Sequence, residues 1–152
     1  LFVGNESERK SILRLIAEYN PYLLDVEFNT IQKDKKLASY LKKSKCKLLI
    51  SWHDFKKTPK ESQLKSRFNK MRKFSNVVKI VTVAKNVSDA SRLLSLYSIK
   101  SKSKTVAFCM GDQGKFSRIL CLHLGSPFTY VSLGKAIAPG QFSVDEIKSI
   151  EN

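Results

Sequence analysis

The sequence is poor in cysteine, and its three cysteines stand far apart at Cys46, Cys109 and Cys121. An odd number without close pairs is not typical of a disulfide framework or of a zinc site. Two of the three lie in apolar segments, where a small buried thiol is ordinary. Neither a disulfide framework nor a structural zinc ion is therefore expected.

Long apolar runs are also missing. No stretch approaches the length of about 20 residues that a membrane-spanning helix needs. The first residues, Leu1 to Asn5, lack the charged region and apolar stretch of a secretory signal. We therefore expect a cytoplasmic protein that has no membrane partner.

Acidic residues are few, 13 against 28 basic ones, which gives a net charge of +15. Such a field attracts polyanions and anionic substrates. Fifteen of the basic residues lie between Lys33 and Lys73, spread over expected solvated helix faces instead of forming a dense run. A solubilising lysine-rich surface is favoured, and a basic α/β module that binds RNA or DNA is the alternative.

The length of 152 residues, with 42% hydrophobic and 27% charged residues, suits one globular unit with its own core, and we expect a single domain over 1–152. Helical segments alternate with short apolar ones that begin 24 to 30 residues apart, a spacing typical of βα units with a parallel sheet. Six helices are expected, with five strands at 23–28, 47–51, 77–83, 104–110 and 128–132.

The periodicity allows two closures of this α/β fold, a doubly wound open sheet or part of a (β/α)8 barrel. No glycine-rich dinucleotide-binding fingerprint follows any strand, which weakens the case for the open sheet. Helix starts are marked by Thr58 with Pro59 and Glu61, by Ser88, and by the pair Ser143 and Glu146.

Both closures place function at the carboxyl ends of the strands, where His53 and Lys79 are candidates. His53 follows the second strand and could transfer protons near neutral pH, or could simply bond loop backbone. Lys79 interrupts an apolar strand. Burial favours the neutral amine, which can attack a carbonyl and form a Schiff base. The alternative is that the lysine side chain snorkels to water.

Arg118 and Gln141 follow the fourth and fifth strands, and both could hold a polar anion. A guanidinium matches a carboxylate in two-point geometry. The turn at Pro139-Gly140 would fix the direction of the Gln141 amide. The alternative is that Arg118 is merely a solvated side chain near a helix start.

Four collinear stretches together resemble the type I 3-dehydroquinate dehydratase family. They are Ile50-Ser51-Trp52-His53-Asp54-Phe55 with Thr58-Pro59, then Lys79-Ile80-Val81, then Met110-Gly111 through Ser117-Arg118-Ile119, and finally Ala138-Pro139-Gly140-Gln141. The resemblance covers nearly the whole chain, and the four stretches in combination are far more specific than any one of them.

The resemblance implies a (β/α)8 barrel that dehydrates 3-dehydroquinate to 3-dehydroshikimate in the shikimate pathway. Lys79 would form the imine and His53 would be the general base and acid, while Arg118 would clamp the substrate carboxylate and Gln141 would bond its hydroxyl groups. No cofactor or metal is required. The partner is the small-molecule substrate, and a homodimer stays open.

The sequence departs from the family pattern in two ways. Ile137 stands where the family often has a serine, four positions before Gln141. Five strands are three short of a barrel, and the family's early Glu-x-Arg strand is absent. We therefore expect an amino-terminal truncation that leaves about the last five strands and six helices, with a catalytically incomplete fragment as the alternative.

Overall fold

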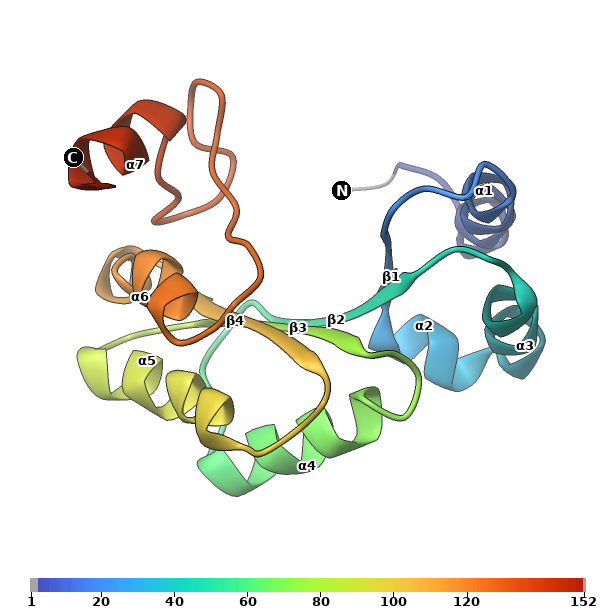
Figure 1. Ribbon diagram of the computed structural model, residues 1–152, viewed down its shortest axis with the longest axis horizontal. Helices are drawn as coiled ribbons and strands as arrows, with labels where there is room; N and C mark the ends of the chain where they lie inside the picture. The colour runs from blue at the N-terminus through green and yellow to red at the C-terminus, as the bar shows by residue number, and fades with distance from the viewer. Residues whose placement is uncertain (1–2, 152) are drawn as a thin grey trace.

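The computed structural model describes residues 3–151, in which helices and strands alternate along the chain (Figure 1). The helices are α1 Glu6–Glu18, α2 Phe28–Lys33, α3 Lys35–Lys43, α4 Glu61–Met71, α5 Val87–Leu94, α6 Ser117–His123 and α7 Val144–Glu151. The strands are β1 Leu24–Glu27, β2 Leu48–Asp54, β3 Val77–Val83 and β4 Lys104–Met110, and short 3-10 helices η1 Ser95–Ser98 and η2 Asp112–Gly114 flank β4. None of the helices in the described part of the chain is long and apolar enough to cross a bilayer.

The four strands form one parallel sheet in the order β1-β2-β3-β4, so each strand lies beside its neighbour in the sequence. A doubly wound sheet reverses its strand order at a switch point, whereas the strands of a (β/α)8 barrel follow one another around the ring. Among the described residues the order runs in one direction without reversal. The parallel α/β prediction is therefore confirmed, and the strand order favours a barrel segment.

Successive side chains of a strand point to opposite faces, and this alternation gives the sheet two distinct faces. The outer face packs against the helices and carries the larger core, which includes Val26, Ile50, Ile80 and Ala107. In Figure 1, α4 and α5 lie beneath this face of the sheet. The inner face carries a second cluster that includes Val81, Val106, Phe108 and Met110, and Lys79 points to this face by alternation with Ile80.

The predicted fifth strand is wrong: residues 128–132 do not join the sheet, and this stretch makes only an isolated bridge between Ser132 and Ser143. Ser126 Oγ donates to the carbonyl of Phe128, and the amide of Ser132 donates to the carbonyl of Phe142. The Phe128 carbonyl and the Ser132 amide therefore form hydrogen bonds within the segment and with the carboxy-terminal residues, and not with β4. Four strands, not five, form the sheet in residues 3–151.

Several predicted boundaries also need correction. The second expected helix divides at Asp34, whose side chain accepts from the amide of Leu37 and so begins α3, which gives seven α-helices in the described residues instead of six. The helix cap expected at Ser88 is Asn86. Thr58 caps nothing, because α4 begins at Glu61 and the Thr58 hydroxyl contacts Thr82 and the carbonyl of Val83.

The other predicted cap, at the start of α7, is confirmed. The amide of Glu146 donates to Ser143 Oγ, and the amide of Ser143 donates back to the Glu146 carboxylate at 2.7 Å. These reciprocal bonds satisfy amides that the first turn of a helix otherwise leaves unpaired. They also hold the pKa of the Glu146 carboxyl below its usual range.

Candidate functional site

Lys79 lies in the middle of β3 with its side chain turned to the inner face and only 9% exposed. Its Nζ atom is 2.5 Å from Oδ2 of Asp25 and 4.8 Å from the centre of the Tyr130 ring. The side chain therefore does not snorkel to water. It is held between a carboxylate from β1 and an aromatic face from the segment after α6, which is a specific environment for one amine.

The sequence predicted that His53 follows the second strand, but the residue lies inside β2. Its Nδ1 atom is 2.6 Å from Oε1 of Glu27, and its ring stacks on Phe55 at a centroid distance of 5.6 Å. The ring therefore bonds a carboxylate instead of loop backbone. A partner at Nδ1 fixes the orientation of the imidazole and leaves Nε2 for exchange of a proton.

The strand register relates His53 to Lys79. Ser51 is the partner of Lys79 across β2 and β3, and His53 is the partner of Val81. His53 and Lys79 therefore share the inner face of adjacent strands, with His53 displaced by two residues, or about 7 Å, toward the carboxyl end.

Arg118 is 2% exposed, close to the start of α6. Its guanidinium lies 4.5 Å from the centre of the Phe108 ring and donates one hydrogen bond, from Nη2 to the carbonyl of Pro139 at 3.5 Å. Its Nε has no partner, and burial lowers the pKa of the guanidinium. Arg118 is thus a desolvated cation with donors to spare, which an anion would satisfy.

An aromatic pair connects the arginine to the lysine. Phe108 lies under the Arg118 guanidinium, and its ring is 5.9 Å from the ring of Tyr130, which in turn faces Lys79. Phe108 is also the register partner of Val81 on the inner face. The structure therefore brings Lys79, His53 and Arg118 to one face of the sheet.

Gln141 is 8% exposed and lies two residues beyond Pro139, whose carbonyl accepts from the amide of Gly111 and from Arg118. The Oε1 atom of Gln141 accepts from the amide of Ile137 at 3.0 Å. This bond closes the turn and leaves the side-chain NH₂ as the free end of the amide. The side chain of Ile137 is exposed.

The two carboxylates of β1 were not predicted from the sequence as site residues. Asp25 and Glu27 stand two residues apart in a short strand, and two acids at that spacing lie on one face of the sheet. This was the available signal. Ser51, between Glu27 and Lys79 in the register, has a buried hydroxyl without a hydrogen-bond partner.

A metal ion has no evident ligand set here. Residues 3–151 contain no group of three or more His, Cys, Asp or Glu side chains that could hold one. The inner face brings together the amine of Lys79, the imidazole of His53, the guanidinium of Arg118 and the carboxylates of Asp25 and Glu27.

Comparison with known proteins places the chain in a family. The model of the family described as type I 3-dehydroquinase matches residues 1–152. Two proteins named 3-dehydroquinate dehydratase are similar in sequence, one from Pyrobaculum aerophilum at 42% identity over 93% of this chain and one from Dehalococcoides mccartyi at 37% over 98%. The chain spans 46% of the first protein and 68% of the second.

Solved structures agree with this assignment. The type I 3-dehydroquinate dehydratase of Clostridium difficile, with covalently modified comenic acid, aligns with a TM-score of 0.86 at 25% identity over 99% of this chain and 62% of its own. The Aquifex aeolicus enzyme aligns with a TM-score of 0.81 at 28% identity over 97% of this chain and 66% of its own. The predicted fold class, part of a (β/α)8 barrel, is confirmed. The chain belongs to the type I 3-dehydroquinase family.

Proposed function

We propose that this protein removes water from 3-dehydroquinate to give 3-dehydroshikimate, a step of the shikimate pathway, through an imine on Lys79. The observation that carries the proposal is the buried Lys79 amine, paired with a carboxylate on the inner face that also holds His53. The relatives that bear the name 3-dehydroquinate dehydratase support the choice of substrate.

The first step would be formation of the imine. Asp25, at 2.5 Å, is placed to accept a proton from Lys79, which leaves the amine lone pair free to add to the substrate ketone. The carbonyl oxygen then departs as water, and a carbon-nitrogen double bond to Lys79 remains. The positively charged iminium withdraws electrons from the neighbouring carbon and lowers the barrier to loss of its proton.

His53 would carry that proton. Its Nε2 removes the proton from the carbon beside the imine, and the electron pair moves into the iminium to form an enamine. The enamine expels the substrate hydroxyl, which takes a proton from His53 and leaves as water. A second water then hydrolyses the imine and regenerates Lys79, so the net change is the loss of one water molecule.

Arg118 and Gln141 would bind the substrate. The free donors of the desolvated Arg118 would hold the carboxylate in two-point geometry, and the side-chain NH₂ of Gln141 would donate to a hydroxyl. Phe108 and Tyr130 lie between Arg118 and Lys79. A substrate whose carboxylate is held by the guanidinium would therefore place its ring over this aromatic pair and its ketone near the Lys79 amine.

The test is reductive trapping. The full-length protein is incubated with 3-dehydroquinate, borohydride is added, and peptides are mapped by mass spectrometry. We expect a stable product adduct on Lys79 and no adduct in Lys79→Ala. The matched control is Lys85→Ala, which removes a lysine just beyond the end of the same strand and should trap normally. An adduct on another lysine, or none, would overturn the proposal.

A further inference from the structure

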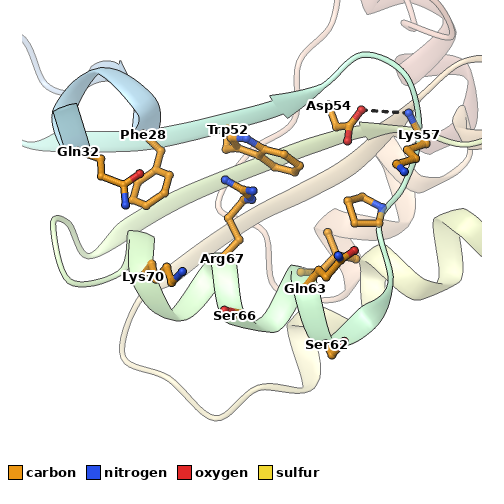
Figure 2. A pocket seen from close by; sticks show the side chains of 12 residues that line it. Phe28, Gln32, Trp52, Asp54, Lys57, Ser62, Gln63, Ser66, Arg67 and Lys70 are labelled. Atoms are coloured by element: carbon orange, nitrogen blue, oxygen red, sulfur yellow. Dashed lines mark hydrogen bonds between the residues drawn. The ribbon is translucent and has the colours of Figure 1, made fainter.

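A groove of about 590 Å³ lies on the outer face of the sheet, between α2, β2 and α4 (Figure 2). All of its lining residues fall within 28–70, so this one stretch of chain builds it. The volume is in the range of small-molecule sites. Because Trp52 and Asp54 alternate with His53 along β2, the groove and the catalytic face lie on opposite sides of the same strand.

Arg67 projects from α4 into the middle of the groove, toward Trp52, as Figure 2 shows. Its guanidinium carbon lies 4.0 Å from the centre of the indole ring. Within residues 3–151 the side chain donates no hydrogen bond and joins no ion pair. The indole therefore fixes the guanidinium in place while its N–H donors stay available to a ligand.

The groove is also electropositive. Lys57 and Lys70 stand near its ends, and neither forms an ion pair with any residue in the described part of the chain. Asp54 is the one carboxylate in the lining, and its Oδ1 accepts from the amides of Lys56 and Lys57 at 2.9 and 3.1 Å. Three cations against one engaged carboxylate leave an excess of two positive charges, which matches a phosphate monoester near neutral pH.

The rest of the lining is polar and uncharged. Gln32 and Gln63 contribute amides, and Ser62 and Ser66 contribute hydroxyls, around the apolar edges of Phe28 and Trp52. Such groups suit the hydroxyls of a small polyol better than an apolar body. We propose that this groove binds a phosphorylated, hydroxyl-bearing small molecule, with its phosphate on Arg67.

Trp52 supplies the test, because it is the only tryptophan of the chain. An anion that binds Arg67 changes the surroundings of the indole 4.0 Å away. Titration of the chain with inorganic phosphate and with glycerol 3-phosphate should give a saturable change in the fluorescence of Trp52. Glycerol 3-phosphate should bind more tightly than inorganic phosphate. Glycerol, and sodium chloride at matched ionic strength, should give no saturable change in fluorescence.

Variants separate the groove from the general positive charge. Arg67→Met should weaken the binding of glycerol 3-phosphate at least about tenfold. Arg67→Lys should weaken it less, because lysine keeps the positive charge and loses only the planar fork of donors. The matched control, Arg72→Met, removes an exposed arginine at the end of the same helix and should leave binding unchanged. Arg118→Met should also leave it unchanged, which excludes the catalytic face as the source of the signal.

Calorimetry on the same variants provides a readout that does not depend on Trp52, and circular dichroism checks that Arg67→Met is folded. Equal weakening by Arg67→Met and Arg72→Met would reduce the effect to bulk charge and overturn the proposal. So would the absence of saturable binding by the unaltered protein up to about 10 mM, a concentration tenfold above a Kd of 1 mM, or full binding by Arg67→Met.

Discussion

The Nζ atom of Lys79 on β3 lies 2.5 Å from Oδ2 of Asp25 on β1, across the intervening strand β2. Strands are about 4.8 Å apart, so this pair spans nearly 10 Å of the inner face. The lysine reaches past Ser51, its direct neighbour in the register, whose hydroxyl is buried without a partner. The amine is thus fixed by a strand that is not adjacent to its own.

Asp25→Asn tests the role of this carboxylate. An amide keeps the size of the side chain but cannot take a proton from Lys79. Imine formation should therefore slow, and borohydride trapping on Lys79 should fall about a hundredfold, the lower end of what a general base contributes. The measurement is the trapping rate at a single pH, with Asp54→Asn, on the opposite face of β2, as the control.

Circular dichroism checks that the Asp25→Asn variant is folded. An unchanged or faster trapping rate in the folded variant would show that Asp25 does not take the proton from Lys79.

Glu27→Gln tests the partner of His53. Glu27 accepts at 2.6 Å from Nδ1, and a neutral amide would no longer favour the same tautomer and orientation of the ring. Turnover should fall about tenfold to a hundredfold, whereas His53→Ala should reduce it by two or more orders of magnitude, roughly the full contribution of a general acid or base. Both variants should still form the borohydride-trapped adduct on Lys79. Unchanged turnover in His53→Ala would remove the assignment of His53 as the acid and base.

Arg118→Lys tests the proposed carboxylate clamp. An ammonium keeps the charge but lacks the planar fork of donors, at a position where the Arg118 side chain is only 2% exposed. KM for 3-dehydroquinate should rise at least about tenfold, equal to about 1.4 kcal/mol, with a smaller effect on kcat. Steady-state kinetics measure both constants, and Arg92→Lys, whose ion pair with Asp89 lies away from the site, is the matched control. An unchanged KM would mean that Arg118 does not contact the substrate.

Thr58→Val tests the corrected role of a residue that the sequence placed at a helix cap. The hydroxyl contacts Thr82 Oγ at 2.7 Å and the carbonyl of Val83 at 2.9 Å, and so ties the loop after β2 to β3. Valine has the same shape without the hydroxyl, so the buried Thr82 hydroxyl and the part-buried Val83 carbonyl each lose one hydrogen bond. Unfolding by urea should show a loss of about 1 to 3 kcal/mol. Lys60→Ala, at the actual cap, should cost less, because its side chain makes no capping bond.

The sequence predicted β3 and β4 well because the signal for each lies within its own run of residues. Val77–Val83 and Lys104–Met110 are continuous apolar runs, as expected for strands covered on both faces, and both ranges are confirmed without change. The one charged residue inside the first of these runs stood out for the same reason. Lys79 could be identified as a candidate without any knowledge of its surroundings.

What surrounds Lys79 could not be read from the sequence, because it depends on register. Asp25 and Tyr130 are 54 and 51 residues from Lys79, on either side. Strand pairing brings Asp25 to the lysine, and the path of the segment after α6 brings Tyr130. The misplaced helix start has a related cause. Thr58, Pro59 and Glu61 satisfy the local capping pattern, but the Thr58 hydroxyl finds better partners on β3. The false strand at 128–132 likewise had strand-like composition but backbone groups bonded elsewhere.

Gly140→Ala tests whether the turn that holds Gln141 depends on close backbone contact. Gly140 has φ +68°, and an added Cβ would lie 2.6 Å from the carbonyl oxygen of Gly111, too near for either backbone to stay in place. The turn would have to move, and with it the Gln141 amide and the Pro139 carbonyl that bonds Arg118. We expect a rise in KM of about tenfold or more and a loss of stability of about 1 kcal/mol or more. Gly125→Ala is the control, because it also has positive φ but nothing within 4 Å of the added atom, so it should lose some stability while KM stays the same. Equal KM values for the two variants would show that the contact between Gly140 and Gly111 does not position the substrate.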